Sequence, residues 1–309
     1  MWQKDLSWRV CGWLCAAGLL TACGTAATRQ EVKVKGSDTV LPIAQQFVEQ
    51  YKVVNPSAVI SVTGGGSGVG IAALLNQTTD LAMASRRIKL SEKLKLKEAH
   101  IAFGELTVAY DALAVCVHPS NPVQGLTRQQ LEGLYTGQIT NWQEVGGPNL
   151  RVVAYSRENS SGTHEFFKEM VLDGREFAPT ALMLPATGAV IQSVSQTPGA
   201  IGYVGLAYLE KTVKALPVSY DGGKTYVAPT LENALNETYP IVRPLYFYYA
   251  VADYPRLQPF LDYISGPEGR AIVRTTGFVP TAEATKANTA TEATDSTQTP
   301  TPAHGTAPH

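Results

Sequence analysis

The chain has 309 residues, of which 44% are hydrophobic and 17% are charged, and its formal net charge is −1. This composition excludes a wholly disordered chain and supplies enough apolar surface for a large core, which we expect to be divided between two lobes. The near-neutral charge argues against a nucleic-acid partner, so any anionic ligand would have to be attracted by charge concentrated in one site.

Residues 1–22 are typical of a secretory signal. Lys4 and Arg9 precede the mostly apolar run Val10–Leu20, and small residues follow it. This run is shorter than the roughly 20 apolar residues that a transmembrane helix needs. Leu20-Thr21-Ala22-Cys23 resembles the bacterial lipobox, in which the signal is cut before a cysteine that is then acylated.

We therefore expect a lipoprotein held on the periplasmic or cell-surface side of the membrane through Cys23, with residues 23–30 as a tether. The alternative is a simple signal peptide or a monotopic anchor with Cys23 left free. The Ala, Thr and Pro-rich residues 282–309 are predicted to be a disordered tail. Cys116 lies in an apolar, strand-like run and is interpreted as a buried hydrophobe rather than a nucleophile.

The first half of the body alternates strands and helices. Apolar residues at helical spacing predict a helix over 40–54, which Asn55-Pro56 ends. The sequence further predicts strands over 31–35, 59–63 and 80–84 and a helix of small residues over 68–76. This order is a βαβαβ unit with a parallel sheet.

A second lobe follows, and Asn121-Pro122 lies between the lobes. Its first predicted elements are a helix over 126–135, a strand over 151–155 and a helix over 163–172. The apolar run 245–251 fits a strand that returns to the first sheet, so the first lobe should be discontinuous in sequence.

Three loops share one plan, in which a strand ends, a short Ser, Thr and Gly turn follows, and a helix begins. They are Gly36–Thr39, Gly64–Gly68 and Ser160–Thr163. In an open parallel sheet such turns lie at the carboxyl ends of strands, where helix N-termini offer unpaired N–H groups and positive potential to an anion. The hydroxyls of the loops would complete a cage of donors for a small oxyanion, and they belong to Ser37, Thr39, Ser67, Ser161 and Thr163.

Arg86 and Arg157 end two further strand-like segments, and a guanidinium can bind an oxyanion through two parallel charged hydrogen bonds. Each loop alone could be an ordinary helix N-cap, Arg157 could be a surface ion pair, and Arg86 could be a strut between the lobes. The agreement of three loops with two arginines favours the oxyanion site.

Other chemistries have little support. The glycine-rich loop lacks the Lys-Ser/Thr of a P-loop and the spacing of a dinucleotide fingerprint, so we expect no cofactor. We also expect no metal, because the histidines form no H-E-x-x-H pair and His164-Glu165 is interpreted as a polar helix face. A Ser67 or Ser161 nucleophile would need a base that the sequence does not locate, which leaves a hydrolase as the minority hypothesis.

These loops resemble, in order and spacing, the motifs of PstS-type periplasmic binding proteins, the phosphate receptors of bacterial phosphate ABC transporters. The resemblance extends from about Val32 to Pro280 and includes Asp80–Arg86, Leu131–Trp142 and Ile201–Val204. It implies an α/β, two-lobed periplasmic-binding-protein fold of type II, in which each lobe is a mostly parallel sheet flanked by helices and a hinge joins the two. We place lobe I at 31–112 and 244–281, and lobe II at 113–243.

The resemblance also implies a function without a reaction, namely a monomer that captures inorganic phosphate between its lobes and delivers it to ABC permease subunits. The phosphate-binding residues carried over are Asp38, Thr39, Val40, Ser67, Arg157, Ser161, Gly162 and Thr163, and we add Ser37, Ser85 and Arg86 to this set. Trp142 and Tyr203 match family positions too, but we interpret them as packing residues.

One departure from the family concerns the proton of the ligand. Some members place an aspartate after the Ala-Ser of the third strand, where it accepts this proton and helps to exclude sulfate, whereas here Arg86 occupies the position. An extra cation should strengthen anion binding but leaves Asp38 as the candidate acceptor, against the alternative that Asp38 only caps the following helix. A receptor for another oxyanion such as sulfate, or a secreted phosphatase or adhesin on this fold, stays an alternative.

Overall fold

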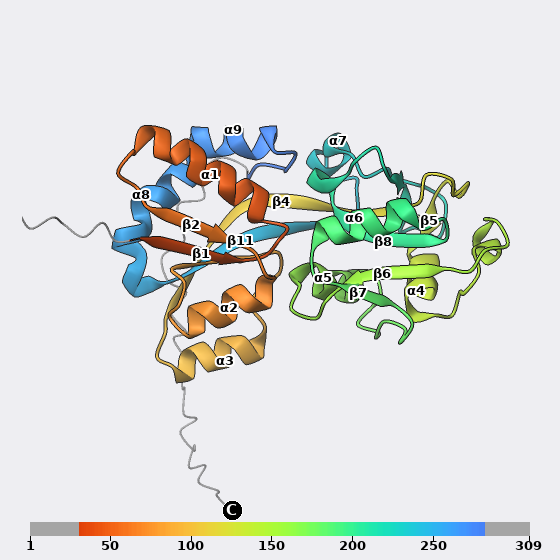
Figure 1. The fold of residues 1–309 in the computed structure, drawn as a ribbon, viewed down its shortest axis with the longest axis horizontal. Helices are drawn as coiled ribbons and strands as arrows, with labels where there is room; N and C mark the ends of the chain where they lie inside the picture. Colours follow the sequence, from red (N-terminus) through yellow and green to blue (C-terminus); the bar gives the residue numbers. More distant parts are fainter. Residues whose placement is uncertain (1–30, 282–309) are drawn as a thin grey trace, which may run out of the picture.

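The computed structural model describes residues 31–281. The predictions made for the signal at 1–22, for lipidation of Cys23 and its tether, and for the tail at 282–309 lie outside the described residues. Figure 1 shows two lobes side by side, and two long strands, β4 and β11, run from one lobe into the other.

The first lobe contains the predicted βαβαβ unit. Its strands β1 (Val32–Gly36), β2 (Ile60–Thr63) and β3 (Leu81–Ala84) form a parallel sheet in the order β2-β1-β3. The helices of this lobe are α1 (Leu41–Val54), α2 (Ser67–Leu75), α3 (Leu90–Glu98), α8 (Tyr254–Ser265) and α9 (Pro267–Thr275). The strands and helices predicted from the sequence over 31–84 are confirmed to within two residues at each end.

Strands β4 (Phe103–Val117) and β11 (Val242–Ala250) connect the lobes. They pair with each other in antiparallel fashion, and β11 also lies antiparallel to β3, which makes the first sheet mixed. The prediction of a strand that returns to the first sheet is therefore confirmed. The carboxyl-terminal part of β4 continues into the second lobe, where it pairs with β8.

The second lobe extends the sheet from β4 through β8 (Ala200–Gly205), β6 (Val153–Arg157) and β7 (Leu182–Leu184), with β6 parallel to both of its neighbours. The short strand β9 (Lys214–Leu216) pairs with β4, and β5 (Leu126–Thr127) pairs with β10 (Val218–Ser219). The helices are α4 (Arg128–Thr136), α5 (Gly162–Met170), α6 (Thr187–Gln196) and α7 (Leu231–Leu235), with 3₁₀ turns η1 (Trp142–Val145) and η2 (Leu206–Tyr208) here and η3 (Val251–Asp253) after β11.

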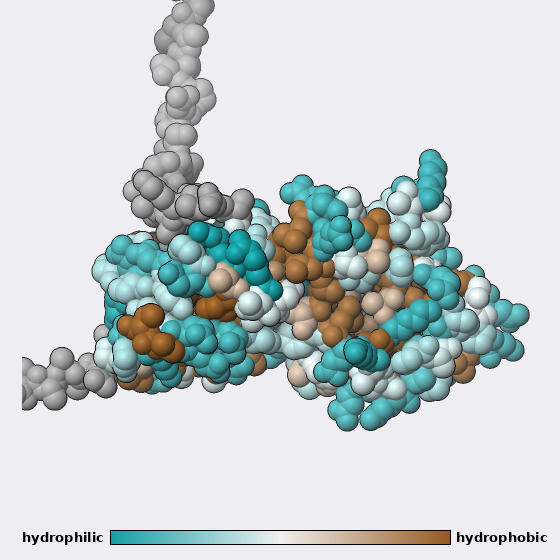
Figure 2. Space-filling model, turned by 90° about the horizontal axis from the view of Figure 1, so that it is seen from above, coloured by the Kyte–Doolittle hydropathy of each residue, from teal (hydrophilic) through white to brown (hydrophobic). Residues whose placement is uncertain are grey.

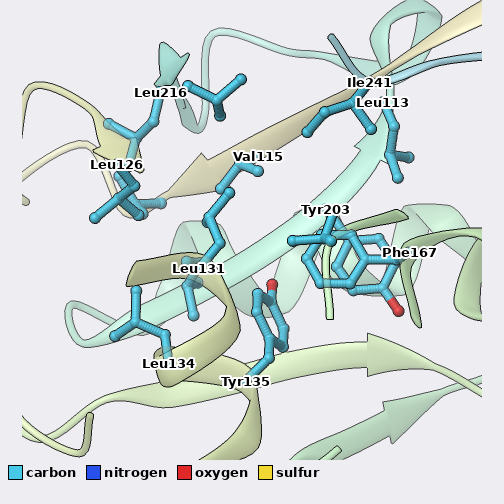
Figure 3. Packing of buried hydrophobic residues seen from close by; sticks show 14 of the residues in the cluster. Leu113, Val115, Leu126, Leu131, Leu134, Tyr135, Phe167, Tyr203, Leu216 and Ile241 are labelled. Carbon is cyan, nitrogen blue, oxygen red and sulfur yellow. The ribbon is translucent and has the colours of Figure 1, made fainter. Parts of the chain in front are cut away.

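Aromatic side chains hold the core of the second lobe together (Figure 3). The rings of Phe167 and Tyr203 stack with centroids 3.9 Å apart, and the ring of Tyr135 packs edge-on against both. Trp142 is fully buried and donates its indole N–H to the main-chain oxygen of Gly199 at 2.9 Å. The interpretation of Trp142 and Tyr203 as packing residues is confirmed, and the core they build gives α5 a fixed position.

His164 is not part of a polar helix face, so that prediction was wrong. Its side chain is buried, and its ring stacks on Phe177 with centroids 4.5 Å apart. Burial lowers the pKa of the His164 imidazole. The interpretation of Cys116 as a buried hydrophobe is confirmed, because the residue is fully buried in β4 and burial raises the pKa of its thiol to about 12.

The surface has polar and apolar regions. On the face seen in Figure 2, hydrophilic side chains cover most of the first lobe, whereas hydrophobic side chains gather on the second lobe. Isolated exposed apolar residues are ordinary on folded proteins.

Between residues 31 and 281 no helix is both long and apolar enough to cross a bilayer.

Candidate oxyanion site at the lobe junction

The three Ser, Thr and Gly loops meet where the two lobes touch. They precede α1 and α2 in the first lobe and α5 in the second. Gly68 donates its N–H to the main-chain oxygen of Ser160 at 2.9 Å, and the hydroxyl oxygens of Thr39 and Thr163 lie 3.0 Å apart. Each of these contacts crosses from one lobe to the other, so three helix N-termini converge on a single region.

Small side chains let the loops approach so closely. Ser67 Oγ accepts a hydrogen bond from the N–H of Ser85 at 3.0 Å and lies 3.3 Å from Ser85 Oγ. A Cβ atom on Gly162 would stand only 2.3 Å from Ser67 Oγ and 2.7 Å from Ser85 Oγ. Any larger residue at position 162 would therefore push the hydroxyls of the first lobe away from the start of α5.

Asp38 and Arg157 form an ion pair across the junction. Arg157 Nη2 lies 2.6 Å from Asp38 Oδ2, and their side chains are 3% and 16% exposed. The other carboxylate oxygen accepts the N–H of Gly65 at 3.0 Å. Asp38 makes no side-chain hydrogen bond that caps α1, so the capping alternative for this residue is wrong.

Arg157 is held firmly by its own lobe as well. Its guanidinium also donates to the main-chain oxygens of Leu184 and Pro185 and to the hydroxyl of Thr187. With Asp38, these acceptors use four of its five N–H donors within the described residues. The alternative that Arg157 is a surface ion pair is wrong, because the residue is only 2% exposed.

Ordinary helix capping occurs at one of the three loops. Ser161 Oγ accepts the N–H groups of Thr163 and His164 at 3.2 and 3.4 Å. α1 and α2 have no side-chain cap. Since a hydroxyl can accept and still donate, capping leaves the proton of Ser161 free for an anion.

Ser37 and Val40 lie in or next to the first loop, but their main-chain hydrogen bonds stay within the first lobe. The N–H of Ser37 donates to Met83 O at 2.9 Å, and the N–H of Val40 donates to Ser37 O at 3.1 Å. Both residues are buried, and Val40 belongs to the hydrophobic core of the lobe. Their contacts shape the loop that presents Asp38 and Thr39.

Arg86 borders the site, but its charge is already paired. Its guanidinium donates to both carboxylate oxygens of Glu92, at 2.8 and 2.7 Å. Although burial opposes the effect, hydrogen bonds from Arg86 and from the Lys89 backbone lower the pKa of Glu92. The strut alternative is wrong for this pair, because Arg86 and Glu92 both belong to the first lobe. A Cβ on Gly68 would lie 3.7 Å from Arg86 Nη2, which places the guanidinium beside the glycine-rich loop.

Sequence reasoning missed a buried ion pair beneath the three loops. Arg243 of β11 contacts Asp111 of β4, with Nη2 and Nε at 2.9 and 3.2 Å from Oδ2, and each side chain is 1% exposed. Burial raises the pKa of Asp111 and lowers that of Arg243, while the partner's charge opposes each shift. The available signal was a charged residue among apolar neighbours in each strand, Asp111 in β4 and Arg243 in β11, because a buried charge needs a partner.

A second missed contact involves a tyrosine of the second lobe. Tyr208, in η2, donates its hydroxyl to the main-chain oxygen of Asp38. Burial, with the nearby Asp38 charge, raises the pKa of this phenol, which keeps it protonated and able to donate. The loop that carries Asp38 is therefore held from the opposite lobe on both its side chain and its backbone.

The fold and the loops at its junction define a two-lobed ligand-binding protein, and residues 21–268 match the family model of the PBP superfamily domain. The phosphate-binding protein PstS of Pseudomonas aeruginosa is 32% identical over 265 residues, covering 79% of this chain and 81% of that protein. PstS of Staphylococcus saprophyticus is 32% identical over 279 residues, covering 85% and 86%.

Solved structures agree with these relatives. A substrate-binding protein from Clostridium perfringens, solved with bound phosphate, has a TM-score of 0.74 at 32% identity. The match covers 82% of this chain and 100% of that protein. An ABC-type phosphate transport receptor from Vibrio cholerae has a TM-score of 0.67 at 30% identity, with 82% and 100% coverage. The chain belongs to the PstS-type phosphate-binding proteins of the PBP superfamily, and the resemblance stated from its motifs is confirmed.

Proposed function

We propose that this protein is an extracytoplasmic receptor that captures inorganic phosphate between its lobes and delivers it to the permease subunits of an ABC transporter. The observation that carries the proposal is the convergence of three helix N-terminal loops with the buried Arg157 at the lobe junction. Helix N-termini and arginine N–H groups are groups that proteins use to bind small oxyanions.

Phosphate would be held by hydrogen bonds from both lobes. The first lobe offers the hydroxyls of Thr39, Ser67 and Ser85, and the second offers Ser161 and Thr163, all of them buried. Arg157 supplies a charge-assisted donor, and Gly162 leaves the space that a Cβ would take. Arg86, whose charge is matched by Glu92, acts in this proposal through the shape of the loop beside it rather than as a free cation.

Binding would be coupled to closure of the lobes. Contacts between the lobes, including the Lys89–Glu165 ion pair at 2.7 Å, support a closed arrangement in which a bound ion would be sealed from water. Residues 112, 243 and 244, where the proposed lobes I and II meet, fall inside β4 and β11. Bending of these two strands would open the junction and admit the ion.

We further propose that the protein binds its ligand without turnover, works as a monomer and is anchored to the membrane through the acylated Cys23. Family membership supports the binding role, since this family consists of substrate-binding transport proteins. The lipobox-like Leu20-Thr21-Ala22-Cys23 supports the anchor. Mass spectrometry of the membrane fraction, with Cys23→Ala as the control, tests it: acylation lost in the variant is expected, and an unmodified Cys23 would contradict it.

Calorimetric titration of the purified protein with phosphate and with sulfate tests the binding role. We expect uptake of one phosphate per chain and weaker binding of sulfate. Tighter binding of sulfate would favour the alternative receptor. A parallel assay with a phosphate ester separates receptor from enzyme, because sustained release of product would contradict the proposal.

A further inference from the structure

Arg243 is the most deeply buried cation at the lobe junction, and it touches both lobes. Its Nη2 lies 3.3 Å from Thr39 Oγ1, and its Nη1 lies 3.5 Å from the main-chain oxygen of Ser85, both in the first lobe. Its guanidinium carbon lies 5.4 Å from the ring centre of Phe166 on α5 of the second lobe. The side chain thus reaches the loops of the candidate site from the strand that joins the lobes.

The contact with Thr39 fixes the direction of a hydrogen bond. A guanidinium can only donate, so the oxygen of Thr39 must accept the N–H of Arg243. The one proton of the Thr39 hydroxyl is then committed to pointing elsewhere, toward Thr163 Oγ1 at 3.0 Å or toward an anion that lies between them. Arg243 thereby occupies one acceptor site of the Thr39 oxygen and leaves the hydroxyl proton to be donated to Thr163 or to an anion.

The charge of Arg243 itself contributes little to anion attraction. Asp111 sits against it with two hydrogen bonds to one carboxylate oxygen, so the pair is neutral as a unit. A neutral pair exerts a much weaker field at a distance than a lone cation. The influence of Arg243 on the site must therefore pass through the groups that it touches.

We propose that Arg243 is a positioning residue that holds the Thr39 hydroxyl as a donor toward an ionised oxygen of the bound oxyanion, with Asp111 fixing the guanidinium. The proposal rests on the phosphate-binding function proposed above. An ionised ligand oxygen is favoured at Thr39, because it accepts the proton of the hydroxyl more strongly than a protonated oxygen does. The proton of the ligand is then left for another acceptor, such as the Asp38 carboxylate.

A double-mutant cycle tests whether Arg243 acts through Thr39. The first change is the paired exchange Arg243→Gln with Asp111→Asn, which removes both charges together and leaves neither unpaired. The second is Thr39→Val. We expect the paired exchange to weaken phosphate binding by roughly tenfold in the otherwise unchanged protein and by less than about twofold when Thr39 is already Val.

The matched control is the exchange Arg256→Gln with Asp80→Asn, which removes an ion pair of the first lobe with a 2.6 Å contact. It should leave phosphate affinity unchanged. Equal loss in both Thr39 backgrounds, or no loss in either, would overturn the role of Arg243. A starting protein that binds no phosphate would instead defeat the proposed function, and this inference with it.

If the protein with the paired exchange does not fold, Arg243→Lys tests the same proposal. This variant keeps a cation beside Asp111, but a single ammonium lacks the planar fork that reaches both Asp111 and Thr39. We expect thermal stability close to that of the unchanged protein and weaker phosphate binding. Phosphate affinity equal to that of the unchanged protein would show that the fork is not needed and would reject the proposal.

Discussion

Asp38→Asn isolates the carboxylate proposed to accept the proton of the ligand. Asp38 now accepts Arg157 on one oxygen and the N–H of Gly65 on the other. An asparagine can keep one acceptor contact, but its NH₂ group must then face another donor, so the ion pair is lost with little change in volume. The substitution removes a negative charge and an acceptor without opening a cavity.

The two anions should respond in opposite directions. Phosphate near neutral pH carries a proton that a carboxylate can accept, and a hydrogen bond to a charged group contributes about 1.5–3 kcal/mol. Sulfate has no such proton and instead is repelled by the carboxylate. We therefore expect the ratio of phosphate affinity to sulfate affinity to fall by at least about tenfold, which corresponds to about 1.4 kcal/mol.

Calorimetric titration of both proteins with each anion measures this ratio directly. Asp80→Asn is the matched control, because Asp80 also accepts one arginine and one backbone N–H, from Arg256 and Lys33, and its side chain has similar exposure at 21%. The control should keep the original ratio. If Asp38→Asn keeps the original affinity ratio as well, Asp38 does not accept the proton of the ligand, and its role is only to hold Arg157 in place.

Three further outcomes are expected. Lys89→Met removes the exposed ion pair with Glu165, so phosphate affinity measured by titration should fall by no more than about fivefold, and the loss should vanish at high salt. The pKa of the buried His164 is lowered in the folded protein, so the unfolded chain binds more protons. The free energy of unfolding measured in urea should therefore be at its full value above about pH 6.5 and fall below that pH, and His164→Phe should abolish this fall. The Tyr135 hydroxyl is buried without a hydrogen-bond partner in residues 31–281, so Tyr135→Phe should leave unfolding free energy unchanged or raise it by about 1 kcal/mol, and a clear loss would contradict this.

The strands, helices and loops could be predicted because the residue pattern that specifies each of them lies within about 15 consecutive residues. Helical spacing located α1, and the Ser, Thr and Gly turns located the three helix starts that meet at the junction. The partners of the charged residues could not be predicted in this way. Arg157 pairs with Asp38 across 119 positions, and Arg243 pairs with Asp111 across 132, so only the fold brings them together.

Burial was the other quantity that the sequence did not supply. His164 was interpreted as polar surface because its neighbour Glu165 is charged, whereas the packing of Phe177 decides that its ring lies inside. Arg86 was interpreted as an extra cation for the bound anion, although Glu92, in the first turn of α3, forms an ion pair with it. In both cases the chemistry of the side chain was known from the sequence, but its burial and its partner were not.

The paired arginines change how anion binding at this site should be understood. Arg157, Arg86 and Arg243 each face one carboxylate, so these three pairs add no net positive charge. The attraction then comes from oriented dipoles, namely the helix N-termini and the loop hydroxyls, together with the one N–H of Arg157 that has no acceptor among the described residues. Dipoles of fixed direction distinguish an oxygen that accepts from one that carries a proton, whereas net charge attracts every anion alike. A site built this way gives up long-range attraction and gains selectivity for the protonation pattern of its ligand.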